Sequence, residues 1–319
     1  MDESHKFREQ KNIIKPEKLR PNGEIRIIAP STYPDIIAMA SSVNEITKLG
    51  YKVTYGLNVK KLNQDNYHAA SPEDRARELM DAFLDDHVGT IFCARGGHAA
   101  RQMLPYLDYD IIREHPKPFI GYSDITSLHM AINKFSGLIT FHGPMPGSDP
   151  DEFQGEKLQS MFKILSGEIS DFEPYIKRLI KYVVEGKAEG RSVGTNMSVF
   201  SSMNGTPFMP DLRGKILFCE DTGARSVDIE RYLDILVLNG GMKELAGFVF
   251  GEFKNRPSTG EVTPYIEDII KEYMERASKP SLAVAPFGHG IEQMLIPLNL
   301  KVRITDSEPY IQPLESSVE

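Results

Sequence analysis

Short apolar runs and longer amphipathic stretches alternate along the first half of the chain. The runs are rich in Ile, Val, Phe and Tyr, as β-strands are, and cover 25–29, 51–55, 88–94 and 119–122. The stretches between them have apolar residues at helical spacing and cover 33–49, 71–83, the segment from 99 onward and 124–135. Strands that alternate with helices predict parallel βαβ units, whose functional groups gather at the carboxyl ends of the strands.

The helix expected over 71–83 has the clearest start signal. Ser71 is a preferred N-cap residue, Pro72 suits the first helical position, and acidic residues follow in the first turn. We therefore expect this helix to begin at Pro72.

The second half of the chain is less regular. From Phe141 onward the composition shifts to prolines and polar residues before the next helical pattern at 156–166. Further strand-like runs and helical patterns follow, the runs at 176–185, 215–219, 247–250 and 301–304 and the helical patterns at 226–239 and 265–277. The expected fold class is α/β, with a Rossmann-like N-terminal domain on a parallel sheet and a smaller α/β C-terminal domain. We expect an N-terminal arm at 1–22, a first domain at 23–148, a linker region at 149–190 and a second domain at 191–319.

Length, charge and cysteine content narrow the functional classes. At 319 residues the chain exceeds the size of one typical core, which favours two domains. The net charge of -8 argues against a nucleic-acid or anionic-membrane partner, because both attract basic surfaces. No apolar signal-peptide core and no membrane-spanning run are present. With only Cys93 and Cys219, a disulfide framework is not expected, and a cytoplasmic location fits. The charged arm is either mobile or clamped onto the body of the protein.

Ser123 lies where an apolar strand meets a helical pattern, in Gly121-Tyr-Ser-Asp-Ile125. A serine on such a turn projects its hydroxyl from the sheet edge beside the amides of a helix N-terminus, as in a nucleophile elbow. The usual G-x-S-x-G pattern is only half met, because Ile125 replaces the second glycine. The same sequence fits equally well a helix N-cap at Ser123 and a first-turn acid at Asp124.

A serine nucleophile needs a base, and a third group that orients the base. Among the eight histidines, His289 is the best candidate, because its flanking glycines allow a tight turn after an apolar run. An ordinary surface turn is the alternative. His98 and His142 lie in candidate site loops and rank second as bases, and His98 fits a substrate contact better. His129 falls elsewhere on the helix that follows Ser123.

Glu220 and Asp221 directly follow the strand-like run 215–219. Glu220 is the better candidate for the orienting acid, whereas Asp221 suits the cap of the next helix. A pair of acids for metal or glycosidic chemistry is less attractive, because successive residues of an extended chain point to opposite sides. We expect no metal site.

Arg95, Gly96 and Gly97 follow another predicted strand. Two glycines at such a place let backbone amides approach a ligand and form one side of an oxyanion hole, with the amide of Asp124 as the other side. No G-x-G-x-x-G motif or P-loop lysine is present, which disfavours phosphate binding, and we expect no cofactor. Arg95 fits a substrate carboxylate or, equally well, a structural ion pair.

These residues resemble the LD-carboxypeptidases, also called muramoyltetrapeptide carboxypeptidases, of serine peptidase family S66. The resemblance extends from Gly23 to Thr305. The matching segments are Ile28-Ala-Pro-Ser31, Arg95-Gly-Gly97, Gly121-Tyr-Ser-Asp-Ile-Thr126, Thr140-Phe-His-Gly-Pro-Met145, Gly194-Thr-Asn196, Pro210-Asp-Leu-Arg-Gly214, Leu217-Phe-Cys-Glu-Asp221 and Pro286-Phe-Gly-His-Gly-Ile-Glu292.

The resemblance implies a catalytic triad of Ser123, Glu220 and His289. It also implies oxyanion amides at Asp124 and in the Gly96-Gly97 turn, a C-terminal domain of the swivelling α/β type, and a homodimer. The implied reaction is metal-free hydrolysis of the amide between meso-diaminopimelate and the terminal D-alanine of murein tetrapeptide. Family members often have Tyr-Gly where this chain has His98 and Ala99, which affects the expected substrate contacts.

Three alternatives remain beside this hypothesis. A related branch of the family cleaves microcin C and similar acyl-sulfamoyl nucleotides, although residues 141–145 resemble the murein branch more closely. A non-catalytic protein that binds cell-wall peptides is the second alternative, and an intact Ser, Glu and His argue against it. The third is an enzyme that uses Cys93 or Cys219 as its nucleophile.

Overall fold

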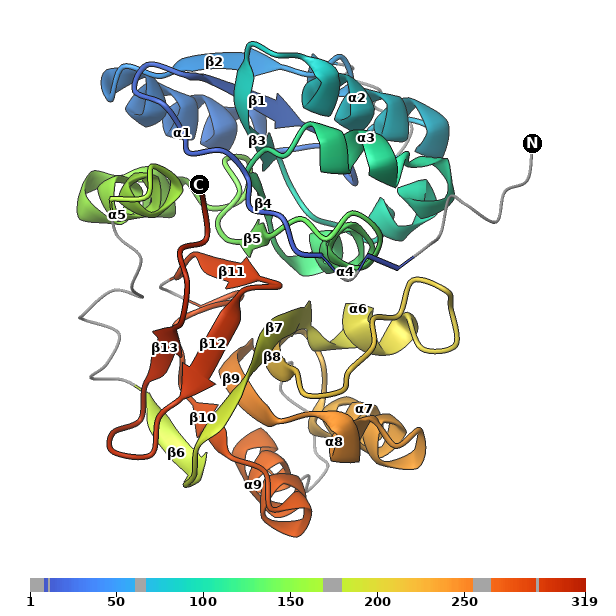
Figure 1. Cartoon of the computed structure of the whole chain (residues 1–319). Coiled ribbons are helices and arrows are strands. Elements are labelled where there is room, and N and C mark those ends of the chain that lie inside the picture. The colour runs from blue at the N-terminus through green and yellow to red at the C-terminus, as the bar shows by residue number, and fades with distance from the viewer. Residues whose placement is uncertain (1–8, 11, 61–66, 169–179, 255–264, 291–292) are drawn as a thin grey trace. The chain divides into compact units, whose positions relative to one another are not determined.

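The protein is described from a computed structural model, which defines residues 9–10, 12–60, 67–168, 180–254, 265–290 and 293–319. The chain divides into two compact units (Figure 1). The first unit consists of Met1–Ser170, Leu295–Asn299 and Ser316–Glu319, and the second consists of Asp171–Met294 and Leu300–Glu315. Within the described ranges, no helix has the length and apolarity needed to cross a membrane.

The first unit is built on a six-stranded sheet with the strand order β11-β5-β4-β3-β1-β2. Its strands are β1 (Glu24–Ile28), β2 (Lys52–Tyr55), β3 (Val88–Cys93), β4 (Phe119–Gly121), β5 (Thr140–His142) and β11 (Ile296–Leu298). Strands β1 to β5 pair in parallel, and β11 pairs antiparallel with β5. This parallel sheet confirms the predicted Rossmann-like architecture of the N-terminal half.

Helices cover both faces of this sheet. They are α1 (Ile36–Lys48), α2 (Pro72–Leu84), α3 (Tyr109–Glu114), α4 (Thr126–Phe135) and α5 (Gly155–Leu165). Figure 1 shows α1 and α5 on one side of the sheet and α2, α3 and α4 on the other. Such a doubly wound sheet brings its functional loops together at the carboxyl ends of the strands.

Local sequence signals explain where these helices begin and end. The helix α2 begins at Pro72 as predicted, and the Ser71 hydroxyl accepts a hydrogen bond from the Asp74 amide at 3.1 Å. The helix expected from residue 99 onward is instead the 3-10 helix η3 (Ala100–Tyr106), and it contains Pro105, which an α-helix would not tolerate in its interior.

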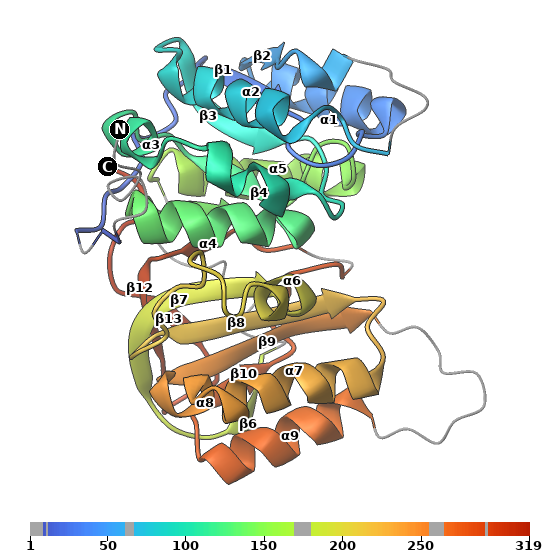
Figure 2. The same cartoon turned by 90° about the vertical axis from the view of Figure 1, so that its right-hand side faces the viewer.

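The second unit is built on a seven-stranded mixed sheet with the order β13-β12-β7-β8-β9-β10-β6. Its strands are β6 (Lys181–Val184), β7 (Ala188–Asn196), β8 (Ile216–Thr222), β9 (Gly247–Lys254), β10 (Ser281–Ala283), β12 (Lys301–Ile304) and β13 (Ile311–Pro313). Strands β7 to β10 are parallel, whereas β6, β12 and β13 pair antiparallel. The helices are α6 (Met197–Ser202), α7 (Ser226–Leu238), α8 (Gly241–Glu244) and α9 (Ile266–Ala277), and Figure 2 shows α7 and α9 along one face of the sheet.

The two units are not two consecutive stretches of sequence. Strand β11 returns to the first unit because its backbone pairs with β5, and the carbonyl of Glu319 accepts a hydrogen bond from the Lys18 amide. The predicted linker region at 149–190 contains the 3-10 helix η5 (Pro150–Phe153), α5 and β6. Part of the predicted strand at 176–185 lies outside the described residues. The predicted division into an arm, a domain, a linker and a second domain, taken in chain order, therefore differs from the two compact units of the structure.

The described part of the N-terminal arm is clamped onto the first unit. Ile14 forms a β-bridge with Leu138, and the amides of Glu17 and Leu19 donate to the carbonyls of Pro116 and Leu165. The Leu19 side chain is buried. Of the two alternatives for the arm, the clamped one therefore holds for residues 12–22.

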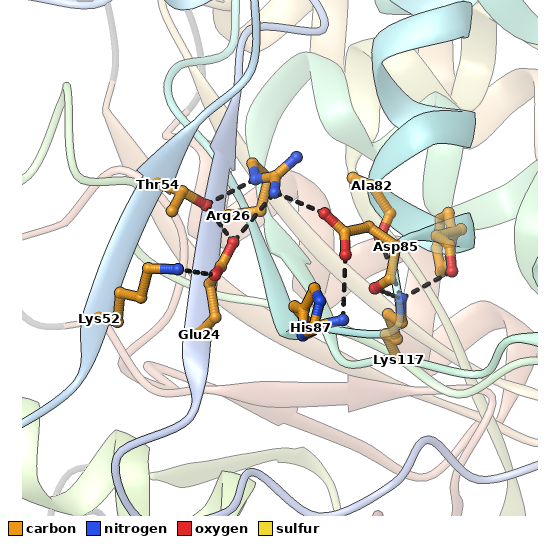
Figure 3. Close-up of polar contacts among 9 residues, drawn as sticks. Glu24, Arg26, Lys52, Thr54, Ala82, Asp85, His87 and Lys117 are labelled. Atoms are coloured by element: carbon orange, nitrogen blue, oxygen red, sulfur yellow. Dashed lines mark hydrogen bonds and ion pairs between the residues drawn. The ribbon is translucent and has the colours of Figure 1, made fainter.

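A partly buried ion-pair network lies at the amino end of β1, on the sheet edge opposite the loops that follow the strands (Figure 3). Glu24 is buried and pairs with Arg26 at 3.0 Å and with Lys52 at 2.6 Å, while the Thr54 hydroxyl also donates to it. Burial alone would raise the pKa of Glu24, but the hydrogen bonds from Lys52, Thr54 and Arg26 outweigh it and lower the pKa from 4.5 to about 2. The network therefore stabilises the ionised carboxylate.

We predict that Glu24→Gln destabilises the protein at neutral pH but much less at acidic pH. A carboxyl group whose pKa falls on folding contributes stability above its unfolded-state pKa, and this contribution is lost as the pH falls from about 4.5 towards 2. The expected loss at pH 7 is only about 1–2 kcal/mol in the free energy of unfolding, since solvent screens the exposed Lys52. Denaturant titrations at pH 7 and pH 3 measure the difference. Glu45→Gln, in an exposed helical pair with Lys48, is the control and should change little.

Candidate active site

Ser123 adopts a backbone conformation that few residues other than glycine tolerate. It follows β4 directly, its φ is +62°, and its side chain is partly exposed. It lies in the 3-10 helix η4 (Ser123–Ile125), and its hydroxyl caps neither this helix nor α4. The N-cap interpretation of Ser123 is therefore wrong, and a strained strand-to-helix turn is the geometry of a nucleophile elbow.

The side chain of Asp124 is buried and holds this turn in place. One carboxylate oxygen accepts hydrogen bonds from the Ser31 hydroxyl at 2.6 Å and from the Ala100 amide at 2.7 Å. Asp124 thereby joins the loop after β4 to the loops after β1 and β3. Its own amide belongs to the first turn of η4, where amides lack an acceptor within the helix.

Gly96 and Gly97 lie close to Ser123 and to the β1 loop. A side-chain carbon on Gly96 would lie 3.1 Å from the Ser123 Cβ and 3.3 Å from its Oγ. Gly97 has a φ of +149°, and a side chain there would overlap Thr32. The Gly96 carbonyl also accepts a hydrogen bond from the Thr32 hydroxyl at 2.6 Å. A side chain at Gly97 would need strained backbone and displacement of Thr32, and one at Gly96 would push against Ser123, so glycines suit this close packing.

Arg75 is a buried residue of α2 that sequence reasoning missed. Its guanidinium donates to the carbonyls of Pro30 at 2.7 Å and Ala99 at 2.9 Å, and to that of Ala70 at 3.1 Å. Arg75 thus holds together the loops after β1 and β3, which lie beside Ser123. An arginine inside an amphipathic helix pattern gives no signal of this role, because most such residues face solvent.

Arg95 and His98 are both exposed in the loop after β3. Arg95 makes only a long contact of 3.4 Å with the Tyr33 carbonyl, so the described residues give it no structural ion pair. The His98 Nε2 lies 3.1 Å from the His68 Nε2, and its ring stacks on Tyr67 with centroids 4.7 Å apart. Burial, followed by the nearby His98 and Arg75, lowers the pKa of His68. The His98 loop therefore carries an exposed aromatic surface.

In the second unit, His289 and Glu220 form a hydrogen-bonded pair. The His289 Nδ1 lies 2.7 Å from the Glu220 Oε2, and the Glu220 side chain is fully buried. In the tautomer that donates a hydrogen bond from Nδ1 to the carboxylate, Nε2 is the nitrogen that can accept a proton. His289 is therefore not an ordinary surface turn residue, and it has the arrangement of a general base with its orienting acid.

Asn196 supports this pair from the neighbouring strand β7, whereas Asp221, next to Glu220 on β8, has another partner. The Asn196 amide donates to the other Glu220 oxygen at 3.1 Å, and in the β7–β8 register Asn196 lies opposite Glu220. Asp221 is buried and accepts a hydrogen bond from the Ser198 amide at 2.7 Å, near the start of α6. Burial raises the pKa of Asp221 to about 6. Asp221 thus supports the start of α6 and does not cap α7 as expected.

The glycines that flank His289 are needed for its position. Gly288 has a φ of +103°, and a side-chain carbon there would lie 2.7 Å from the Cβ, Cγ and Oε2 of Glu220. A side chain on Gly290 would overlap the carboxylate of Glu252. The glycines therefore allow more than a tight turn, because two carboxylates occupy the space beside them.

The remaining candidate residues have other environments. His129 is buried and bonds the Thr140 hydroxyl and the Gly121 carbonyl through its two ring nitrogens, and burial lowers its pKa to about 4. His142 is buried in β5 beside Tyr122. Burial raises the pKa of Cys93 and of Cys219, which disfavours the thiolate that a cysteine nucleophile requires. Among the residues that the structure describes, no group of three or more potential ligands surrounds a metal position.

Comparison with known proteins gives matches over most of the chain. The LD-carboxypeptidase N-terminal domain matches residues 25–143, and the LD-carboxypeptidase C-terminal domain matches residues 189–304. The probable murein peptide carboxypeptidase of Bacillus subtilis is 35% identical over 298 residues, which covers 92% of each chain. The microcin C7 self-immunity protein MccF of Escherichia coli is 28% identical over 306 residues, covering 86% of this chain and 88% of MccF.

Solved structures show the same fold. The structure of MccF in complex with glutamyl sulfamoyl guanosine superposes with a TM-score of 0.85 and 23% identity, covering 96% of this chain and 99% of that one. At this identity the likeness supports the two-domain α/β fold and leaves the chemistry to the site residues.

We predict that Gly288→Ala breaks the pairing of His289 with Glu220. The new methyl group would require both a strained backbone and displacement of the Glu220 side chain. The hydrogen-bonded Nδ1 proton should give a low-field resonance in the proton NMR spectrum of the wild type and disappear in the variant. Gly205→Ala is the matched control, because Gly205 also has a positive φ, of +76°, but open space around it. An unchanged resonance in Gly288→Ala would contradict the assignment.

We predict that Asp221→Asn stabilises the protein above pH 6 and not at pH 4. A carboxyl group whose pKa is raised from 3.8 to about 6 by burial costs stability when it must ionise in the folded state. The cost grows between these two pH values and reaches about 1–3 kcal/mol above them. The amide oxygen of asparagine still accepts from Ser198. Urea unfolding of both proteins at pH 4 and pH 7.5 measures this, and an equal effect at both pH values would exclude the ionisation.

Proposed function

The chain belongs to the LD-carboxypeptidase family and is a serine-type carboxypeptidase, and we propose that it releases the terminal D-alanine from murein tetrapeptide. The bond cleaved is the amide between meso-diaminopimelate and D-alanine. The observation that carries the proposal is the 2.7 Å hydrogen bond between His289 and the buried Glu220. A binding protein has no need of such a proton relay, which supports an enzyme over a non-catalytic peptide binder.

In the proposed mechanism, Ser123 attacks the scissile carbonyl while the His289 Nε2 removes its proton. Glu220 keeps the imidazole in the required tautomer and stabilises the imidazolium that forms. His289 then protonates the amine of the departing D-alanine, and water hydrolyses the acyl-enzyme with the same histidine as base. The proposal requires Ser123 of the first unit and His289 of the second to meet during the reaction.

The oxyanion of the tetrahedral intermediate is assigned to the amides of Asp124 and of the Gly96-Gly97 turn. Support comes from the closeness of Gly96 to the Ser123 side chain and from the position of Asp124 in the first turn of η4. Arg95, exposed in the same loop, is assigned to the terminal carboxylate of the substrate, and His98 to a further substrate contact. A cation at the terminal carboxylate explains exopeptidase action.

The murein substrate is favoured over an acyl-sulfamoyl nucleotide by the sequence relatives. The identity to a probable murein peptide carboxypeptidase is 35%, and that to the microcin C7 self-immunity protein is 28%. A cytoplasmic location and a homodimer complete the proposal, in keeping with the family resemblance.

We predict that purified protein releases D-alanine from L-Ala-γ-D-Glu-meso-diaminopimelate-D-Ala, and that Ser123→Ala lowers kcat/KM at least about 1,000-fold. Mass spectrometry of the tripeptide product measures the reaction. The matched control is Ser127→Ala, since Ser127 is a buried serine of α4 whose hydroxyl bonds the Asp124 carbonyl. Cleavage of glutamyl sulfamoyl adenosine with an intact tetrapeptide would favour the other substrate. Activity of Ser123→Ala within tenfold of wild type would overturn the nucleophile.

A further inference from the structure

Glu252 is projected next to the His289 turn by an irregularity in the sheet of the second unit. Cys219 of β8 pairs with Phe250 of β9, and Asp221 pairs with Phe253. Glu220 on one strand therefore stands opposite two residues on the other, Gly251 and Glu252. Such a bulge bends the strand and redirects a side chain, and bulges are common beside active sites.

The Glu252 backbone and carboxylate both contact the turn that carries His289. The Glu252 amide donates to the Phe287 carbonyl at 3.2 Å, and a β-bridge joins Glu252 to Gly288. The carboxylate lies against Gly290, where the absence of a side chain leaves room for it. Glu252 and Glu220 thus lie against the glycines on the two sides of His289.

Within the part of the chain that the structure describes, the other carboxylates near His289 have hydrogen-bond partners. Glu220 bonds His289 and Asn196, and Asp221 bonds the Ser198 amide. Across the described chain, no hydrogen bond or ion pair reaches the carboxylate of Glu252, which is half-buried in β9. A half-buried carboxylate without a partner has lost part of its hydration and gains most from a cationic ligand.

We propose that Glu252 is a specificity-determining residue that binds a side-chain ammonium on the substrate residue that supplies the scissile carbonyl. This inference rests on the proposed function, because it takes His289 as the residue that acts at the scissile bond. The ammonium forms a charge-assisted hydrogen bond with Glu252 while the terminal carboxylate is bound elsewhere. The ligand class is a peptide with a free amino group on that side chain, such as meso-diaminopimelate or lysine.

The experiment compares two tetrapeptides with wild type and with Glu252→Gln. One peptide has a free side-chain amino group on meso-diaminopimelate, and the other has the same group acetylated, which converts the ammonium into a neutral amide with a single N–H donor. In wild type we expect kcat/KM for the free amine to be at least about tenfold higher. In Glu252→Gln we expect KM for the free amine to rise about tenfold with little change in kcat, and the acetylated peptide to be cleaved as by wild type.

Glu267→Gln, an exposed acid in the first turn of α9, is the matched control and should not alter the discrimination. Equal cleavage of the two peptides by wild type, or an equal loss for both peptides in Glu252→Gln, would overturn the assignment. The second result would mean that Glu252 only positions the turn of His289.

Binding measurements separate this inference from the proposed function. Calorimetric titration of both peptides into Ser123→Ala, and into the double variant with Glu252→Gln, measures the dissociation constant of each peptide without cleavage. Tighter binding of the free amine that depends on Glu252, with no D-alanine released by wild type, would reject the proposed reaction and keep the ammonium site. Release of D-alanine with no preference for the free amine would reject the ammonium site and keep the reaction.

Discussion

The left-handed backbone at Ser123 is the constraint on which the first half of the site depends. With a φ of +62°, the serine occupies a region that costs free energy for any residue with a side chain, so its surroundings must hold it there. The buried Asp124 side chain fixes the turn to the loops after β1 and β3. Arg75 joins the same loops through their carbonyls. Removing these contacts would let the turn relax and the hydroxyl move.

Each unit has a glycine that lets a loop lie against a candidate site residue. Gly96 lets the loop after β3 lie against Ser123, and Gly288 lets the turn of His289 lie against Glu220. Both places are at the carboxyl ends of parallel strands, where an α/β sheet gathers its loops. Ser123 and the amides beside it belong to the first unit, and the hydrogen-bonded pair of His289 and Glu220 belongs to the second.

The sequence predicted the strand and helix order of the first unit well because its periodicity is strong and its start signals are local. The Ser71 cap illustrates this, since every atom involved lies within four residues. The pairing of β11 with β5 was not predictable, because it joins segments far apart in sequence through a three-residue strand. Proline also made one prediction wrong. The segment of η3 has a helical pattern, but Pro105 excludes an α-helix there, and the segment is a 3-10 helix.

Single site residues were ambiguous from the sequence, and the structure removes some of the alternatives. Ser123 fitted a cap and a nucleophile equally well, and its φ and its uncapped hydroxyl exclude the cap. Glu220 and His289 were named from motif positions. Their hydrogen bond joins residues that are far apart in the sequence, so only the structure shows it. Arg75, Asn196 and Glu252 were not singled out as site residues, because their contacts come from burial and from a register shift, which no local pattern records.

If His289, held by Glu220, activates Ser123, the rate at which a fluorophosphonate labels Ser123 depends on His289. Peptide mass spectrometry follows this rate. We expect one adduct, on the peptide that contains Ser123, and a labelling rate at least about 100-fold lower in His289→Ala. An adduct on another residue, or an unchanged rate in His289→Ala, would contradict it.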